Sequence, residues 1–172
     1  MQVLKTDSEI LIVGASPTGL ALAAELKLRG ADPVIIDRQT AGTNTSRACV
    51  VHARTLEVLE PLGVTADLLG EGVKVPIFRT RDRDHVLITI DFSEIPSAYP
   101  FTLMCPHDRF ERCLLSHLEG LGASFIRSCE LIRCKALASH VEVKVRTERA
   151  TKTIKAEWLI GCDGMHSTIR EQ

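Results

Sequence analysis

Residues 10–20 read Ile10-Leu11-Ile12-Val13-Gly14-Ala15-Ser16-Pro17-Thr18-Gly19-Leu20, and the rest of the chain is organised around them. Its first four residues form an unbroken apolar run, which is typical of a parallel strand covered on both faces. Gly14 permits a tight turn that a β-carbon would hinder, and Pro17 suits the first turn of a helix. Gly19 lets that helix pack close to the strand. The stretch therefore predicts a strand, a turn and a helix in direct succession.

The turn has the pattern Gly-x-Ser-x-x-Gly, so Ser16 stands where the dinucleotide-binding fingerprint has its middle glycine. A helix that begins at such a turn presents free N–H groups and a partial positive charge, which together bind a pyrophosphate. This near-match alone does not separate a dinucleotide site from an ordinary turn, and the residues that follow are needed to decide.

A second strand and an acidic residue follow at the expected spacing. Residues 17–29 are rich in Leu and Ala and predict a helix that Gly30 ends. The run 33–37 predicts a short buried strand, which completes a βαβ unit. It ends in Asp37, 23 residues after Gly14, close to the offset of about 20 at which an acidic side chain meets a ribose hydroxyl. The alternative is a solvated aspartate at a strand end, but the register of strand, turn, helix and acid favours the ribose.

Composition limits the class of protein. The chain has 172 residues, a formal net charge of −1 and 45% hydrophobic residues, which predict a single globular domain over 1–172. Its balanced charge and lack of a Lys/Arg run argue against nucleic acid as a partner. The first seven residues lack the apolar core of a secretory signal, and no apolar run approaches the roughly 20 residues of a membrane span. We therefore expect a cytoplasmic protein with no membrane partner.

Six cysteines are spread over different predicted elements: Cys49, Cys105, Cys113, Cys129, Cys134 and Cys162. None forms a C-x-x-C pair, and no Cys/His cluster has the spacing of zinc ligands. The sequence predicts reduced thiols, several of them buried, and no metal site.

The remainder of the chain adds strands and helices to the βαβ unit. Residues 75–81 and 85–91 predict a small hairpin around Asp82-Arg83-Asp84. Asp108 with Glu111 resembles a capping box and predicts the start of a helix. The other expected elements are a loop at 38–50, helices at 52–62 and 64–69, a loop at 93–100, a third parallel strand at 123–127, a β-meander with strands at 131–137, 141–146 and 153–158, and a buried apolar run at 158–161.

Three separated motifs make the chain resemble a known family. They are the opening turn with Asp37-Arg38; Ser46-Arg47-Ala48 with His52-Ala53-Arg54-Thr55-Leu56-Glu57 and Leu62-Gly63; and Gly161-Cys162-Asp163-Gly164-Met165-His166-Ser167-Thr168-Ile169-Arg170. In their order and spacing the chain resembles the FAD-dependent monooxygenases of the aromatic-hydroxylase type, similar to p-hydroxybenzoate and phenol hydroxylases. The third motif is the most specific and resembles the family signature Gly-Cys-Asp-Gly-x-x-Ser-x-x-Arg. The resemblance implies an α/β fold: a Rossmann-like, FAD-binding parallel sheet with an inserted β-meander and a small β-hairpin.

The resemblance also implies how individual residues bind FAD. Those expected to hold the pyrophosphate at the helix N-terminus are Gly14, Ser16, Pro17, Thr18 and Gly19. Asp37 would accept a hydrogen bond from the adenosine ribose, and Arg38 would lie near the adenine. Arg47 would pair with the pyrophosphate, which a guanidinium can contact bidentately. Asp163 would organise the site by orienting donors or water, because a carboxylate cannot bind phosphate directly. Ser167 is expected to form a local hydrogen bond.

Several residues depart from the family pattern. Ser16 adds a hydroxymethyl group where backbone and phosphate approach each other, so a weakened, displaced or lost FAD is one expectation. Pro106-His107 stands where the family commonly has a Gln on the flavin side. His107 is thus the one candidate for a catalytic residue, with an ordinary histidine at a helix start as the alternative. The family continues well past residue 172, so the chain is expected to be truncated relative to it, and 75–105 to belong to the substrate region.

The implied function is that of a flavoprotein oxidoreductase of secondary metabolism. It would use FAD, with NADPH as reductant, to hydroxylate an aromatic or polyketide-like substrate as a monooxygenase. Two alternatives remain open: a cofactor-free cyclase, isomerase or hydrolase that reuses the fold, and a non-catalytic partner subunit. Uncovered apolar surface around the 76–91 hairpin predicts a homodimer or association with another chain in all three cases.

Overall fold

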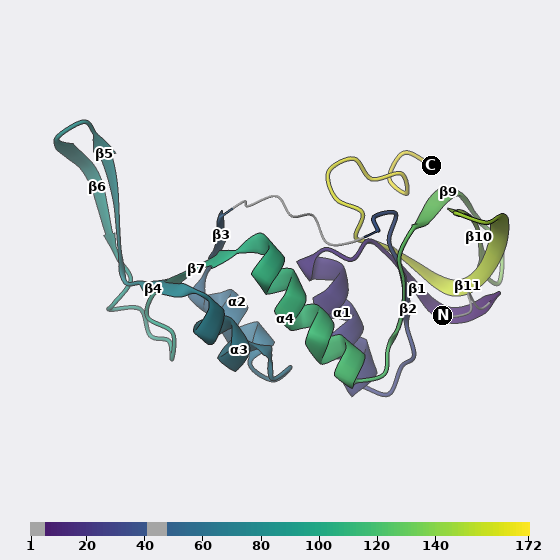
Figure 1. The fold of residues 1–172 in the computed structure, drawn as a ribbon, viewed down its shortest axis with the longest axis horizontal. Coiled ribbons are helices and arrows are strands. Elements are labelled where there is room, and N and C mark those ends of the chain that lie inside the picture. Colours follow the sequence, from purple (N-terminus) through teal and green to yellow (C-terminus); the bar gives the residue numbers. More distant parts are fainter. Residues whose placement is uncertain (1–5, 41–47) are drawn as a thin grey trace. The chain divides into compact units, whose positions relative to one another are not determined.

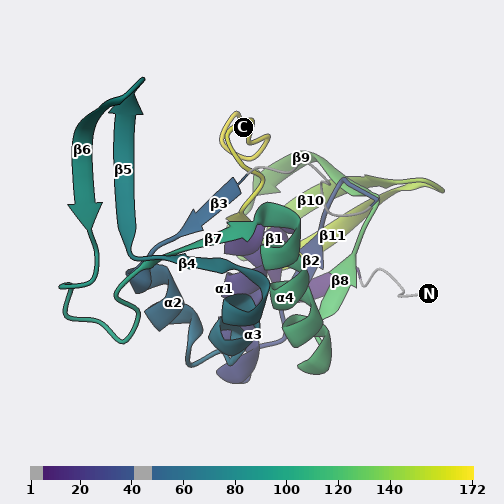
Figure 2. The same ribbon diagram turned by 60° about the vertical axis from the view of Figure 1, so that its left-hand side comes forward.

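A computed structural model of the chain describes residues 6–40 and 48–172, which fall into two compact units (Figures 1 and 2). Unit 1 comprises Met1–Thr43 and Leu114–Gln172, and unit 2 comprises Asn44–Cys113. Among the described residues, no helix combines the length and the apolar character that crossing a membrane requires. The single domain over 1–172 stays a prediction, and each unit is described by itself.

Unit 1 is built on a six-stranded sheet in the order β8-β2-β1-β11-β10-β9 (Figure 1). Its strands are β1 (Asp7–Val13), β2 (Val34–Ile36), β8 (Ser124–Ile126), β9 (Cys129–Ala136), β10 (Val141–Thr147) and β11 (Thr151–Gly161). The strands β8, β2, β1 and β11 pair in parallel, whereas β9, β10 and β11 form an antiparallel meander. This arrangement confirms the predicted α/β fold with an inserted meander.

The apolar run that opens the sequence forms the centre of this sheet. Leu11 and Ile12 of β1 are fully buried, as are Ile35 and Ile36 of the neighbouring β2. Because both faces of these strands are covered, every residue of the run is apolar rather than alternating with polar residues. The helix α1 (Pro17–Leu28) contacts β1 and β2 and ends before Gly30, whose left-handed φ of +85° makes glycine the favoured residue there.

The strand β11 belongs to both parts of the sheet. Its first half pairs with β10 in antiparallel register, and residues 155–161 pair with β1 in parallel register. The sequence suggested a meander strand followed by a separate buried run at 158–161, and the structure makes them one continuous strand. Trp158 is 67% exposed, Leu159 and Ile160 are partly buried and Gly161 is exposed, so the expectation of a buried run is wrong. In β10 the predicted alternation holds, since Val143 and Val145 are buried whereas Lys144 and Arg146 are exposed.

Unit 2 contains a three-stranded antiparallel sheet, two short helices and a separate hairpin. The elements are β3 (Ala48–Val51), α2 (Ala53–Leu59), α3 (Val64–Glu71), β4 (Val73–Val75), β5 (Ile77–Asp82), β6 (His85–Asp91), β7 (Thr102–Pro106) and the first half of α4 (His107–Gly120), which continues into unit 1. The strands β3 and β7 were not expected from the sequence, which suggested a loop at 38–50, overlapping β3, and assigned no element to 101–106. The run 75–81 divides at Pro76, so that Val75 ends β4 and Ile77 begins the hairpin.

The start of α4 also differs from the expectation. The helix begins at His107, so Asp108 lies inside the first turn and is not its cap. Glu111 lies 3.2 Å from His107, and Asp108 lies 3.5 Å from Arg112. The spacing that resembled a capping box therefore reflects two pairs of side chains four residues apart along one helix.

The hairpin β5–β6 stands apart from α2 and α3 of its own unit (Figure 2). All its residues are exposed. The register pairs Phe78 with Ile90 and Thr80 with Ile88, so that Phe78, Ile88 and Ile90 share one face of the ribbon. These three side chains are 44–56% exposed, which makes this face of the hairpin an apolar surface without cover in unit 2.

Candidate functional site

The turn after β1 is packed so closely that glycine is required at two positions. Gly14 has a φ of +106°, and a β-carbon on it would lie 2.3 Å from the carbonyl oxygen of Cys162. A β-carbon on Gly19 would lie 2.0 Å from the carbonyl oxygen of Gly14. The end of β1, the start of α1 and the residue that follows β11 thus meet with no room for a side chain. The glycine spacing of the fingerprint follows from this contact.

The N-terminus of α1 has no side-chain cap. Ser16 occupies the N-cap position in an extended conformation, yet its hydroxyl does not accept a hydrogen bond from the helix. Instead the Ser16 Oγ donates to the carbonyl oxygen of Cys162 at 3.3 Å. Pro17 fills the first helical position, where its missing N–H leaves no donor unsatisfied. The other N–H groups of the first turn lack intrahelical partners by geometry and are suited to an anionic ligand.

Asp37 lies directly beside this turn. Its Oδ2 accepts a hydrogen bond from the Ala15 N–H at 2.6 Å, and its Oδ1 accepts one from the Gln39 N–H at 2.7 Å. A carboxylate has about four lone-pair sites, so each oxygen retains capacity for another donor such as a ribose hydroxyl. Arg38 is exposed beside it. Arg47, the expected partner of the pyrophosphate, lies outside the described residues.

The third motif folds back on itself after β11. The Cys162 N–H donates to the Val13 carbonyl at 2.7 Å, which continues the parallel pairing into the turn. Asp163 Oδ2 accepts from the Ile169 N–H at 3.4 Å, and Ser167 Oγ accepts from the Arg170 N–H at 3.1 Å. The local hydrogen bond predicted for Ser167 is thereby confirmed. The Arg170 guanidinium donates to the carbonyl of Met165 within the same segment.

The thiols near this motif are kept protonated. Burial raises the pKa of the Cys162 thiol, and the negative charge of Asp163 raises it further. The same two causes raise the pKa of Cys134 in β9. Because the thiolate is the nucleophilic form of cysteine, neither residue is suited to covalent catalysis near neutral pH. Cys105 and Cys129 are buried, as predicted for several of the cysteines.

His107 has a local partner in unit 2. Its Nε2 lies 3.2 Å from Oε1 of Glu111 on the next turn of α4, and its side chain is one-third exposed. This contact explains a histidine at the start of the helix without a catalytic task. A catalytic role for His107 stays a prediction.

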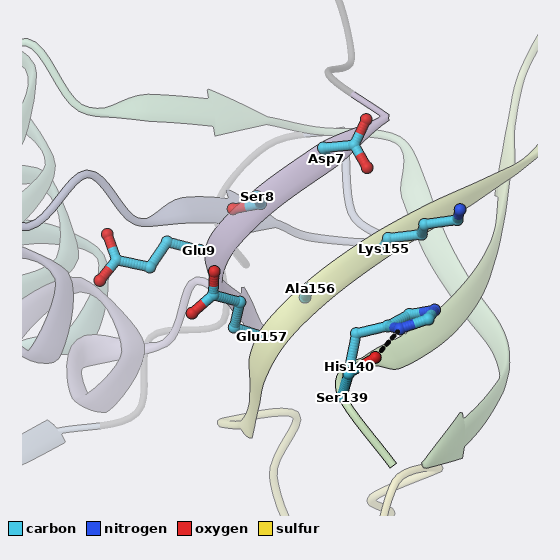
Figure 3. A pocket seen from close by; sticks show the side chains of 8 residues that line it. All are labelled: Asp7, Ser8, Glu9, Ser139, His140, Lys155, Ala156 and Glu157. Atoms are coloured by element: carbon cyan, nitrogen blue, oxygen red, sulfur yellow. Dashed lines mark hydrogen bonds between the residues drawn. The ribbon is translucent and has the colours of Figure 1, made fainter. Parts of the chain in front are cut away.

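A hollow of about 440 Å³ lies at the other end of β1 (Figure 3). Its lining residues come from the start of β1, the turn before β10 and the middle of β11: Asp7, Ser8, Glu9, Ser139, His140, Lys155, Ala156 and Glu157. The Nε2 of His140 is buried without a hydrogen bond and lies 3.9 Å from Glu142, while its Nδ1 lies 3.1 Å from the Ser139 hydroxyl. Since ligands of open α/β sheets bind outside the carboxyl ends of the strands, this hollow at the amino end of β1 is not the dinucleotide site.

Within unit 1 the structure thus brings together Gly14, Ser16, Gly19, Asp37 and the Cys162–Asp163 turn. Sequence reasoning missed that the Cys162 carbonyl is the partner of Ser16, and that Ala15 N–H is held by Asp37. The first contact joins residues 146 positions apart, and no local pattern in the sequence signals it. An N-cap serine predicts a bond to its own helix instead.

A parallel sheet, a glycine-bounded turn at an uncapped helix N-terminus and an acid at the end of the next strand are typical of dinucleotide-binding α/β proteins. A family model described as an FAD binding domain matches residues 7–172. The chain belongs to the family of FAD-binding monooxygenases of the aromatic-hydroxylase type.

Individual relatives agree with this assignment. The chain is 37% identical to 6-methylpretetramide 4-monooxygenase of Streptomyces rimosus over 166 residues, which cover 95% of the chain and 30% of that protein. The solved structure of OxyS anhydrotetracycline hydroxylase from Streptomyces rimosus matches with a TM-score of 0.87 and 32% identity, over 96% of the chain and 33% of that protein. Dialkyldecalin synthase of Streptomyces rugosporus is 30% identical over 95% of the chain and 34% of its own length. The chain therefore spans about a third of the length of these relatives.

Proposed function

We propose that the chain binds FAD and that the protein is an NADPH-dependent monooxygenase, which hydroxylates an aromatic or polyketide-like substrate. The observation that carries this proposal is the turn at Gly14–Gly19. It leaves the first N–H groups of α1 without a side-chain cap, and it is tied by hydrogen bonds to Asp37 on one side and to Cys162 on the other. The monooxygenase and hydroxylase names among the relatives support the reaction type.

Each residue of the site has a binding task in this proposal. The pyrophosphate lies against the first turn of α1, held by N–H groups between Gly14 and Gly19, with Pro17 and Thr18 on the same turn. The ribose hydroxyls donate to the Asp37 carboxylate, whose two oxygens are already oriented by backbone N–H groups. Arg38 lies on the adenine side, and Arg47 supplies a positive charge to the pyrophosphate. Asp163 holds the segment that follows β11 through the Ile169 N–H.

When bound, the cofactor would supply the redox chemistry, in which reduced flavin reacts with dioxygen. The residues of this chain bind and orient its adenosine and pyrophosphate half. His107 is the only residue proposed near the reacting end. The Nε2 of its ring lies beside the Glu111 carboxylate, so we propose that His107 holds a proton shared with Glu111. A cytoplasmic location is part of the same proposal.

The decisive experiment is a titration of the purified chain with FAD, followed by flavin absorbance and fluorescence. We expect saturable binding that ADP competes away, because ADP carries the ribose and pyrophosphate that the site recognises. FMN lacks the adenosine half and serves as the control, with binding at least tenfold weaker. A chain that binds no FAD, or that binds FMN equally well, would refute the proposed site.

A cyclase is the second candidate function. It rests on the similarity to dialkyldecalin synthase, whose name describes ring formation rather than hydroxylation. In this alternative the fold is retained while the redox chemistry is not used, and no FAD is needed. Turnover of a polyene or polyketide substrate without NADPH and without dioxygen would favour the cyclase, whereas product formation that depends on both would favour the monooxygenase. A non-catalytic partner subunit would form no product under either condition.

Self-association is a further part of the proposal. The apolar face formed by Phe78, Ile88 and Ile90 is without cover in unit 2, and such surfaces favour association with a second copy or another chain. Sedimentation at micromolar concentration tests this expectation. A stable monomer would contradict it, and a dimer that Ile88→Lys dissociates would support it.

A further inference from the structure

The serine in the fingerprint turn raises the question of what its side chain does. In the glycine-rich pattern, the middle glycine lets the backbone approach the pyrophosphate. Ser16 has φ −67° and ψ 167°, an extended conformation that any residue adopts. The backbone at this position therefore does not require glycine, in contrast to Gly14 at φ +106°. A side chain is tolerated here if it is directed away from the ligand.

The hydroxyl of Ser16 is directed toward the third motif. It donates to the Cys162 carbonyl at 3.3 Å and makes no cap to its own helix. Serine at an N-cap usually accepts a hydrogen bond from the second or third helical N–H. Because the Ser16 Oγ accepts no hydrogen bond from its own helix, these N–H groups remain available to an external acceptor, and the bond that Oγ donates joins the turn to Cys162.

The turn is then held from both sides. Toward β2, the Gly14 N–H donates to the Ile36 carbonyl at 2.8 Å, and the Ala15 N–H donates to Asp37 at 2.6 Å. Toward β11, the Cys162 N–H donates to the Val13 carbonyl at 2.7 Å, and the Ser16 hydroxyl donates to the Cys162 carbonyl. A glycine at position 16 would leave only backbone contacts on the β11 side.

We infer that Ser16 is a positioning residue, whose hydroxyl fixes the fingerprint turn to the Cys162–Asp163 turn and so preorganises the pyrophosphate site. This inference rests on the proposed binding of FAD. It reverses the expectation that the hydroxymethyl group obstructs the cofactor. Rigid placement of donors before the ligand arrives lowers the entropy lost on binding.

The test compares Ser16→Ala, Ser16→Gly and Ser16→Thr in the 172-residue chain. Loss of one hydroxyl hydrogen bond is expected to weaken FAD binding by about twofold to tenfold, in the Ala and the Gly variant alike, whereas Thr retains a hydroxyl and binds as the unaltered chain does. Ser8→Ala is the matched control: it removes a serine hydroxyl that donates to a backbone carbonyl at the other end of β1, and FAD affinity should not change. Tighter binding by Ser16→Gly than by the unaltered chain, or equal binding by all variants, overturns the inference.

Hydrogen exchange without cofactor separates this inference from the proposed function. Ser16→Ala should accelerate exchange of the hydrogen-bonded amides of Gly14, Ala15 and Cys162 in the FAD-free chain, and Ser8→Ala should not. If the unaltered chain binds no FAD, the proposed function fails, and the exchange result alone decides whether Ser16 holds the turn. Unchanged exchange in Ser16→Ala overturns the role of the hydroxyl whatever the result with FAD.

Discussion

Replacement of Gly14 by alanine tests the close contact on which the site depends. Two costs add at this position: a backbone with φ +106°, which costs a non-glycine residue about 1–3 kcal/mol, and overlap with the Cys162 carbonyl oxygen at 2.3 Å. Overpacking of this kind costs about 1–3 kcal/mol, and more where backbone has to move. Gly14→Ala should therefore lower the free energy of unfolding by about 2–6 kcal/mol, a large part of the 5–15 kcal/mol typical of a folded protein.

Two further variants separate the two costs. Gly30 also has a left-handed φ, +85°, but a β-carbon there meets nothing within 4 Å; Gly30→Ala should cost about 1–2 kcal/mol. Gly19→Ala introduces only the overlap, because its β-carbon would lie 2.0 Å from the Gly14 carbonyl oxygen. The destabilisation from this overlap is offset by about 1 kcal/mol, because alanine favours the helix over glycine. Urea denaturation followed by far-ultraviolet circular dichroism measures all three. If Gly14→Ala is no more destabilising than Gly30→Ala, β11 does not approach the turn as closely as described. If Gly14→Ala does not fold, the stability of Gly19→Ala is compared with that of Gly30→Ala instead.

Three other predictions concern single side chains. Thr65 is buried and its hydroxyl donates to the Leu56 carbonyl at 2.7 Å, so Thr65→Val should lower the free energy of unfolding by about 1–2 kcal/mol in urea denaturation. Burial raises the pKa of the Cys129 thiol to about 11 from an ordinary 9.0. The unfolded chain then loses this proton first, so stability should fall as pH rises from 9 to 11, by up to about 2 kcal/mol. Asp163→Asn removes a charge that raises the pKa of Cys162, so iodoacetamide should alkylate that thiol faster at about pH 8, as measured by mass spectrometry.

Each of these has a control within the same chain. Thr55 is exposed, and Thr55→Val should change stability by less than about 0.5 kcal/mol. Cys129→Ala should lack the part of the pH dependence assigned to that thiol, and an unchanged slope would contradict the assignment. Cys129 itself provides the reference for alkylation, because burial alone raises its pKa; an equal acceleration at Cys129 in Asp163→Asn would indicate general loosening of the fold.

Local patterns in the sequence predicted the elements that depend on local chemistry. The apolar run at Ile10–Val13, the helix that ends at Gly30 and the alternating valines of β10 all have the predicted secondary structure. What the sequence did not reveal depends on distant partners. The strands β3 and β7 exist because they pair with each other, and the exposure of Trp158 depends on which face of β11 is covered. For the site, residue types predicted the turn and Asp37, but the direction of the Ser16 hydroxyl depended on a carbonyl 146 residues away.

The position of β11 has a consequence for the order in which the protein folds. The ribosome makes the turn at Gly14 well before it makes the strand that closes one side of this turn, because that strand ends at Gly161. Until that strand pairs with β1, the Cys162 carbonyl is not in place and the N–H groups of the turn have no fixed arrangement. Contacts so distant in sequence form slowly because the intervening chain must first be ordered. If the chain binds FAD as proposed, FAD added during refolding should be taken up with the kinetics of β11 docking rather than with those of α1.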